Sequence, residues 1–252
     1  MDDNSQDTTV ALLRQFSPFA SMLFFAPGNN LTPETVAFNG TAALVDTGKR
    51  KLILTNSHVY RRFRELRSET PSLAMFLTGS HQTQIVELKD THLVDEGGSA
   101  VDLAAFALEH PEQVGLIGKS YFRAAAWPPA RPIAETTAVV VGFVGEHRQV
   151  GKDSLKINLS VICDKVTSVS DRHFVLVDED RARISVKVNP TLGELGDLGG
   201  MSGSPAFAIG LDGEPYFAGV LYEAGEGKEA MVFAVHADFL TAEGKIDRSR
   251  MR

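Results

Sequence analysis

The chain has 252 residues, of which 25 are basic and 32 acidic, so its formal net charge is −7, and 43% of its residues are hydrophobic. This is the composition of a soluble globular protein that is long enough to fold without disulfides or metal. The acidic balance argues against broad nucleic-acid binding, because a surface that neutralises phosphates usually carries a basic excess.

Cysteine and histidine usage excludes further classes. Cys163 is the only cysteine, so no intrachain disulfide forms, and neither a CxxC nor an HExxH zinc motif is present. We therefore expect no metal and no other cofactor. The N-terminus is acidic where a signal peptide would be basic, and the apolar run Phe19–Ala26 is too short to cross a membrane. These features predict a cytoplasmic protein without a membrane partner.

Short apolar and β-branched runs, separated by Gly and Pro, predict many strands and few helices. In chain order, the predicted strands are 19–25, 36–45, 51–55, 73–77, 83–88, 103–108, 137–144, 155–163, 174–177, 184–188, 205–209, 216–222 and 230–235. Helices are predicted at 57–67 and from about His236 onward, and the pattern also allows one at 8–16. The sequence thus predicts an all-β protein, a barrel or a sandwich, with a C-terminal helix.

A proline cluster divides these strands into two similar groups. Three prolines between Trp127 and Pro132 make a central strand there implausible. We therefore expect two β units joined by a linker. Their boundaries are predicted as an N-terminal extension 1–17, a first barrel 18–120, a linker 121–135, a second barrel 136–240 and a tail 241–252.

The segment Gly199–Pro205, with the sequence GGMSGSP, is the most informative. A serine between glycines allows backbone amides to approach a substrate carbonyl and to form an oxyanion hole. The alternative is a plain Gly/Ser-rich hairpin. Two further segments favour chemistry: a strand that runs into His58 at a probable helix start, and Asp102 at the start of an almost uncharged strand. Taken singly, each residue also fits a structural role.

Together these segments resemble the trypsin-like (chymotrypsin-fold) serine proteases, especially their disulfide-free bacterial members. The matching pieces are Gly40–Val45, Leu54–Val59, Asp102–Ala104 and Gly200–Pro205, in the family's order of His, Asp and Ser. The resemblance covers about residues 18–240 and implies two antiparallel β-barrels that share one active site.

Position by position, the resemblance implies that Ser202 is the nucleophile, His58 the general base and Asp102 the residue that orients the imidazole. It implies that the amides of Gly200 and Ser202 form the oxyanion hole. Met201 departs from the family pattern, because many members carry there an aspartate that pairs with a freed N-terminus, so activation by that ion pair is not expected.

The substrate-binding residues implied by the resemblance lie in two segments. Gly196 falls near the base of the specificity pocket with Asp197 beside it, and the strand that ends in Leu221, Tyr222 and Glu223 forms a wall. An acid at Asp197 would favour a basic substrate side chain, whereas an Asp197 that points to solvent would not.

The expected function is a serine endopeptidase that cleaves a protein or peptide substrate through a covalent acyl-enzyme. An α/β-hydrolase fits poorly, because its Gly-x-Ser-x-Gly motif and its Ser-first order are not followed here. Two alternatives stay open: a protease-like fold that serves as a binding or scaffold module, and a latent protease that needs an activating partner protein.

Overall fold

Two β-sheets form most of the protein. A computed structural model describes residues 3–28, 38–79, 84–88, 91–144, 149–151, 154–156, 159–177, 199–224 and 231–251. The elements up to residue 123 are α1 (Asp3–Phe16), η1 (Ser17–Phe19), β1 (Ala20–Pro27), β2 (Phe38–Asp46), β3 (Lys51–Thr55), α2 (Ser57–Glu69), β4 (Leu73–Thr78), β5 (Ile85–Glu87), β6 (Thr91–Glu96), β7 (Ala104–Leu108), α3 (Gln113–Leu116) and β8 (Phe122–Arg123). Those after it are β9 (Thr137–Phe143), β10 (Gln149–Gly151), β11 (Ser154–Lys156), β12 (Leu159–Val169), β13 (His173–Val177), β14 (Pro205–Ile209), β15 (Pro215–Ala224), β16 (Met231–His236) and the 3₁₀ turns η4 (Ala237–Phe239) and η5 (Arg248–Met251).

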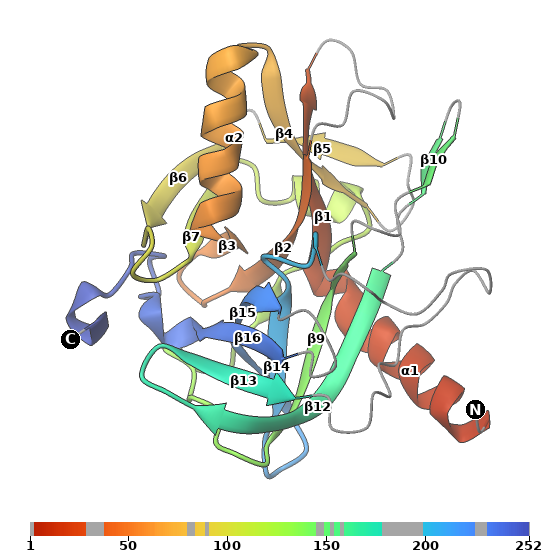
Figure 1. Ribbon diagram of the computed structural model, residues 1–252, viewed down its shortest axis with the longest axis vertical. Helices are drawn as coiled ribbons and strands as arrows, with labels where there is room; N and C mark the ends of the chain where they lie inside the picture. The colour runs from red at the N-terminus through yellow and green to blue at the C-terminus, as the bar shows by residue number, and fades with distance from the viewer. Residues whose placement is uncertain are drawn as a thin grey trace.

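The first sheet is a half-barrel with the strand order β5-β4-β1-β2-β3-β7-β6, and β8 pairs in parallel with β2. Its central strand β1 is buried on both faces. Leu23 and Phe25 point into one core cluster, whereas Met22 and Phe24 point into another, as the alternation of side chains along a strand requires. Helix α2 stands against this sheet beside β4 and β6 (Figure 1).

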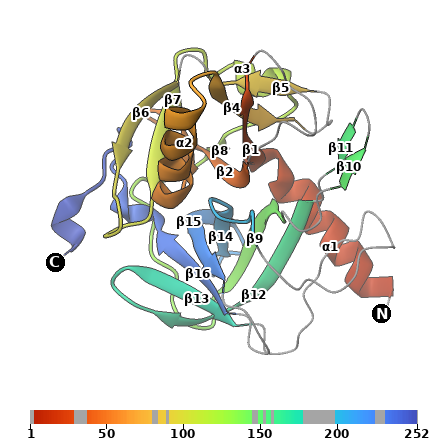
Figure 2. The ribbon, with the colours of Figure 1, turned by 45° about the horizontal axis from the view of Figure 1, so that its top comes forward.

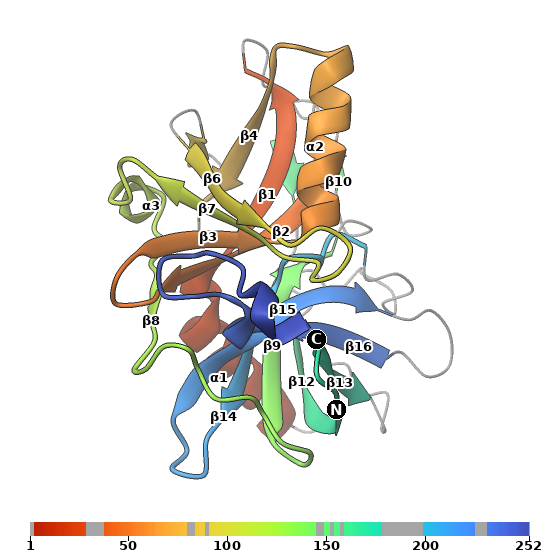
Figure 3. The ribbon, with the colours of Figure 1, turned by 90° about the vertical axis from the view of Figure 1, so that its left-hand side faces the viewer.

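The second sheet is a closed barrel in the order β12-β13-β16-β15-β14-β9. It lies below the first sheet in Figure 3, and β10 and β11 form a separate hairpin. Closure leaves the main barrel without a free edge. The two sheets together confirm the predicted all-β double-barrel class.

One hydrophobic cluster belongs to both sheets. It contains Ala43 and Leu54 from the first sheet, Val141 and Phe217 from the second, and Phe16 from the end of α1. Helix α1 runs beside β12 of the second barrel and enters β1 of the first (Figure 2). The helix allowed by the sequence at 8–16 therefore exists and begins earlier, at Asp3.

Several elements differ from their predicted limits. The run 155–163 divides into β11 and β12, and the C-terminal helix is limited to the two 3₁₀ turns η4 and η5. Gly244, with φ +83°, lies in the turn between these two, a conformation that disfavours a continuous helix. Strand β6 was not predicted, because it is mostly polar and partly exposed. The predicted strand 184–188 lies outside the described residues.

Candidate active site

His58 is the second residue of helix α2, directly after strand β3. The helix is fixed on the sheet by Val59 and Phe63, four residues apart and both buried. Asn56 is the N-cap residue, but its side chain makes no capping bond. Its Nδ2 instead donates to the carbonyl of Asp102 at 2.7 Å. The start of the helix is thus bonded to the chain around Asp102.

Asp102 binds His58 twice. Its Oδ1 accepts the backbone N–H of His58 at 2.9 Å, and its Oδ2 lies 2.5 Å from the ring Nδ1. A carboxylate only accepts, so Nδ1 carries the proton and Nε2 is left to accept one. A third hydrogen bond, from Ser57 Oγ to the carbonyl of Leu103 at 2.9 Å, also joins the start of α2 to the chain around Asp102.

Ser202 lies in the tight turn that precedes β14. Gly203 has φ +94°, and a Cβ there would lie 1.9 Å from the carbonyl oxygen of Thr41, so no other residue fits. Gly203 N–H donates to the carbonyl of Leu221, and Ser204 N–H donates to that of Met201, both at 2.9 Å. The turn is therefore held against β15 and closed upon itself.

The serine turn of the second barrel contacts the first sheet at Gly40. A Cβ on Gly40 would lie 3.3 Å from the carbonyl oxygen of Ser202 and 3.4 Å from Cγ1 of Val59, the residue after His58. The carbonyl of Ser202 and the side chain of Val59 thus both lie next to Gly40. The serine turn of the second barrel is therefore close to the start of α2, where His58 and Asp102 are bonded.

Two backbone donors of the serine turn, the N–H groups of Gly200 and Ser202, have no hydrogen-bond acceptor among the described residues. Ser202 Oγ and the His58 ring are likewise not joined by a hydrogen bond in this part of the chain. Such bonds are often long in enzymes without substrate and tighten when substrate binds.

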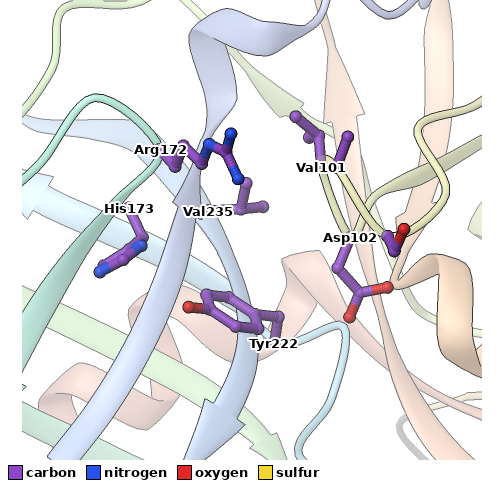
Figure 4. Close-up of a pocket in the computed structure, with 8 residues that line it drawn as sticks. Val101, Asp102, Arg172, His173, Tyr222 and Val235 are labelled. Atoms are coloured by element: carbon purple, nitrogen blue, oxygen red, sulfur yellow. The ribbon is translucent and has the colours of Figure 1, made fainter. Parts of the chain in front are cut away.

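A pocket of about 220 Å³ lies beside this junction. Figure 4 shows its walls: Val101 and Asp102 come from the loop between β6 and β7, Arg172 and His173 from the β12–β13 hairpin, and Tyr222 from β15. Burial raises the pKa of Tyr222, and the charges of Glu223 and Asp102 raise it further, so its hydroxyl stays protonated at neutral pH.

The predicted substrate-binding residues are placed differently from one another. Tyr222 lines the pocket, and Glu223 is exposed beside it. The Leu221 side chain is buried in the barrel core, and only its backbone faces the serine turn, through bonds to Gly203 and Ser204. Gly196 and Asp197 lie outside the described residues.

The search for other kinds of site gave two findings. Within the described ranges, no group of three or more His, Cys, Asp or Glu side chains is arranged to hold a metal ion. The same ranges contain no helix of sufficient length and apolar character to span a membrane.

Two residues of interest were missed by the sequence reasoning. Thr41 bonds to the serine turn from a strand more than 150 residues earlier. Its only local signal in the sequence is a polar residue directly before the apolar run 42–45, and it is buried in the structure. Arg172 reaches the pocket from a hairpin, and no local pattern marks it.

Comparisons with known proteins agree with this architecture. Neither protein-family models nor curated proteins gave a match to the sequence. Among solved structures, the thermostable serine protease AL20 from an extremophilic microorganism has a TM-score of 0.52 and 13% identity, with 87% of this chain and 91% of that chain covered. Deg5 has a TM-score of 0.51 and 13% identity, with 94% and 92% covered. The chain therefore has the chymotrypsin-like fold of the trypsin-like serine proteases.

Proposed function

We propose that this protein is a serine endopeptidase that uses Ser202, His58 and Asp102. The observation that carries the proposal is the pair of hydrogen bonds between Asp102 and His58, which fix both the backbone and the ring of the histidine. This pattern lies near a serine turn in which two amides have no acceptor within the described part of the chain. A binding module has no chemical need for that combination.

The proposed reaction begins when Ser202 Oγ attacks the carbonyl carbon of the scissile peptide bond. His58 Nε2 takes the hydroxyl proton as the bond forms, and Asp102 stabilises the resulting imidazolium. His58 then returns the proton to the leaving amine, and an acyl-enzyme remains on Ser202. Water, deprotonated by the same nitrogen, releases the acid and regenerates the serine.

The unused amides of Gly200 and Ser202 would stabilise the oxyanion of each tetrahedral intermediate. Donors that are fixed before the reaction do not have to reorganise as charge develops on the oxygen, and loss of one such donor costs on the order of 100-fold or more in rate. A peptide or protein is proposed as the substrate because a solved structure of the same fold is a serine protease.

A serine-directed fluorophosphonate tests the proposal. We expect the wild type to be labelled at Ser202, and Ser202→Ala and His58→Ala to lose both labelling and peptide cleavage while far-UV circular dichroism stays unchanged. If the folded wild type stays unlabelled across a range of pH and salt, the endopeptidase proposal fails.

The missing hydrogen bond between Ser202 Oγ and His58 supports a second candidate, a protease-like fold that acts as a latent or inactive binding module. The same reagent separates the two. A module with no activity stays unlabelled under all conditions, whereas a latent protease is labelled only after an activating partner protein is added.

A further inference from the structure

Thr41 fastens the serine turn to the first sheet at two points. Its Oγ1 donates to the carbonyl of Gly200 at 3.0 Å, and its backbone N–H donates to the carbonyl of Ser202 at 2.8 Å. The side chain is fully buried, and its Oγ1 also accepts the N–H of Phe143 at 3.1 Å. One threonine thus binds both carbonyls that flank Met201.

These bonds fix the backbone on both sides of the Ser202 N–H. In a trans peptide the C=O and N–H groups are antiparallel, so a held carbonyl also fixes the N–H of the next residue. The carbonyls of Gly200 and Ser202 share their peptide units with the N–H groups of Met201 and Gly203, so Thr41 holds the two units on either side of the one that carries the Ser202 N–H. The remaining carbonyl of the turn, that of Met201, is held by Ser204 N–H. The Met201 side chain is fully buried in the barrel core and carries no charge.

We infer that the Thr41 hydroxyl is a positioning group that keeps the turn ready to bind an oxyanion, so that no activating ion pair is needed. This inference rests on the proposed endopeptidase function. Thr41 acts through Gly200 and touches no substrate. Without its hydroxyl, the Gly200 carbonyl and the Phe143 N–H would both be buried without this partner, and the turn would gain freedom to rotate.

The test compares Thr41→Val with Thr41→Ser. We expect Val, which keeps the shape and loses the hydroxyl, to lower kcat about 10-fold or more with KM nearly unchanged, because the oxyanion forms only during reaction. Thr41→Ser keeps the hydroxyl, so its kcat should lie within about twofold of the wild-type value. If Thr41→Val does not fold, Thr41→Cys replaces it, with a smaller loss in the same direction.

Thr47→Val is the matched control. Thr47 is also a buried threonine, and its Oγ1 is bonded to the carbonyls of Ala242 at 2.6 Å and Arg50 at 3.1 Å, away from the serine turn. We expect it to lose similar stability and to keep its kcat. Equal losses of kcat in the two valine variants, or no loss in Thr41→Val, would overturn the positioning role. Failure of wild-type labelling at Ser202 would instead overturn the proposed function.

A second observation concerns the pocket beside Asp102. Among the described residues, Arg172 is the only lysine or arginine that lines it. Its side chain is exposed and lies over Val235, across the pocket from Val101 (Figure 4). Its guanidinium has no ion-pair or hydrogen-bond partner within the described ranges. The one carboxylate of the lining, Asp102, is already bonded to His58.

The other pocket walls are suited to hold a side chain beside this charge. Tyr222 and Val235 offer apolar surface, and the His173 ring packs edge-on against Tyr222 with centroids 6.1 Å apart. An unpaired guanidinium above such a wall matches a carboxylate, which it can bind through two parallel hydrogen bonds.

We propose that Arg172 selects substrates with Asp or Glu at one fixed position relative to the cleaved bond. This proposal also rests on the endopeptidase function. An acidic side chain in the pocket would give the guanidinium the partner that it lacks within the described chain. Because the pair would be partly exposed, we expect a preference of about 3- to 10-fold over neutral residues.

Cleavage of a peptide mixture, read by mass spectrometry of the products, tests this selection. We expect wild-type products to be enriched in Asp and Glu at one position, Arg172→Gln to lose the enrichment, and Arg172→Glu to favour Lys and Arg there. Arg67→Gln, an exposed arginine on α2, serves as the matched control and should keep the wild-type pattern.

The remaining results show which of the two proposals fails. Wild-type cleavage without acidic enrichment, or an equal loss in Arg172→Gln for every peptide, would overturn the selection by Arg172 and leave the endopeptidase function intact. An absence of both cleavage and Ser202 labelling would overturn both.

Discussion

Gly142 and Ser204 face each other directly beneath the serine turn. A Cβ on Gly142 would lie 1.8 Å from Ser204 Oγ and 3.0 Å from its Cβ. Ser204 is fully buried, and its hydroxyl has no hydrogen-bond partner in the part of the chain that the structure describes. The glycine of β9 is therefore required by the serine of the turn, since no positive φ is recorded at Gly142.

This contact predicts that Ser204→Gly relieves the destabilisation caused by Gly142→Ala. Gly142→Ala alone should lower the free energy of unfolding by about 1–3 kcal/mol, as overpacking does, because the new methyl group collides with Ser204. In a Ser204→Gly background both colliding atoms are gone, so the same change should cost less than half as much. Urea unfolding of the two single variants and the double variant measures the coupling. Additive losses would show that Gly142 is required for another reason.

The residues that the sequence identified are those whose chemistry is unusual for their surroundings. His58 at a helix start and Asp102 beside an apolar strand were paired through the resemblance to trypsin-like proteases, and they are bonded. Thr41 could not be foreseen, because its partners Gly200 and Phe143 lie about 100 or more residues away and only the packing of the two sheets brings them together. Arg172 is invisible for the same reason.

Three elements meet at Lys119, which follows α3. Its side chain is buried, its Nζ donates to the carbonyl of Ser17 in η1 at 3.0 Å, and it lies over the ring of Phe143 at the end of β9. No carboxylate bonds it within the described ranges. Burial lowers the pKa of Lys119 to about 8, because the charged ammonium loses its hydration.

The lowered pKa predicts that stability rises with pH. Between the folded value, about 8, and the ordinary value of about 10.4, the unfolded chain binds more protons than the folded chain, so the free energy of unfolding increases through this window. Between pH 8 and pH 10, the free energy of unfolding of the wild type should rise by about 2–3 kcal/mol relative to that of Lys119→Met. Urea unfolding of both proteins at pH 7.5, 9 and 10 measures the difference.

The control for this measurement is Lys49→Met, since Lys49 is well exposed and paired with Glu243. The difference in free energy of unfolding between Lys49→Met and wild type should not change with pH over the same range. Tyr121, whose pKa is also raised by burial, is present in both members of each pair and cancels. If the difference in free energy of unfolding between Lys119→Met and wild type also did not change with pH, the Lys119 ammonium of the wild type would be hydrated.

Elements with strong apolar character were predictable, whereas those stabilised by their position in the fold were not. Strand β1 reads as a continuous apolar run because both of its faces are covered. Strand β6 is mostly polar, and it forms because it pairs with β7 at the edge of the sheet. Such an edge strand leaves little periodic signal in the sequence.

The C-terminal segment ties the two halves of the molecule together. Arg248 binds both carboxylate oxygens of Asp95 in β6 at 2.9 Å, which holds the pKa of Asp95 well below its usual range. Two residues later, Arg250 binds Asp238 after the second barrel, and Arg131 of the linker binds the same carboxylate at 2.9 Å. The segment that leaves the second barrel is thus anchored on the first sheet.

The shared core and this anchor predict that the two halves unfold together, although each has its own sheet. Trp127, the only tryptophan, packs against the cluster that both sheets share: its Nε1 donates to the carbonyl of Leu240 at 2.7 Å, and its ring stacks on Phe217. In urea, Trp127 fluorescence, far-UV circular dichroism and fluorophosphonate labelling of Ser202 should give one coincident midpoint. If circular dichroism changed first while Trp127 fluorescence persisted, the first sheet would be an independent unit, and the cluster that joins the sheets would contribute little to stability. Coincidence is expected because exposure of either sheet would remove one side of the cluster that contains Phe16, Leu54 and Phe217.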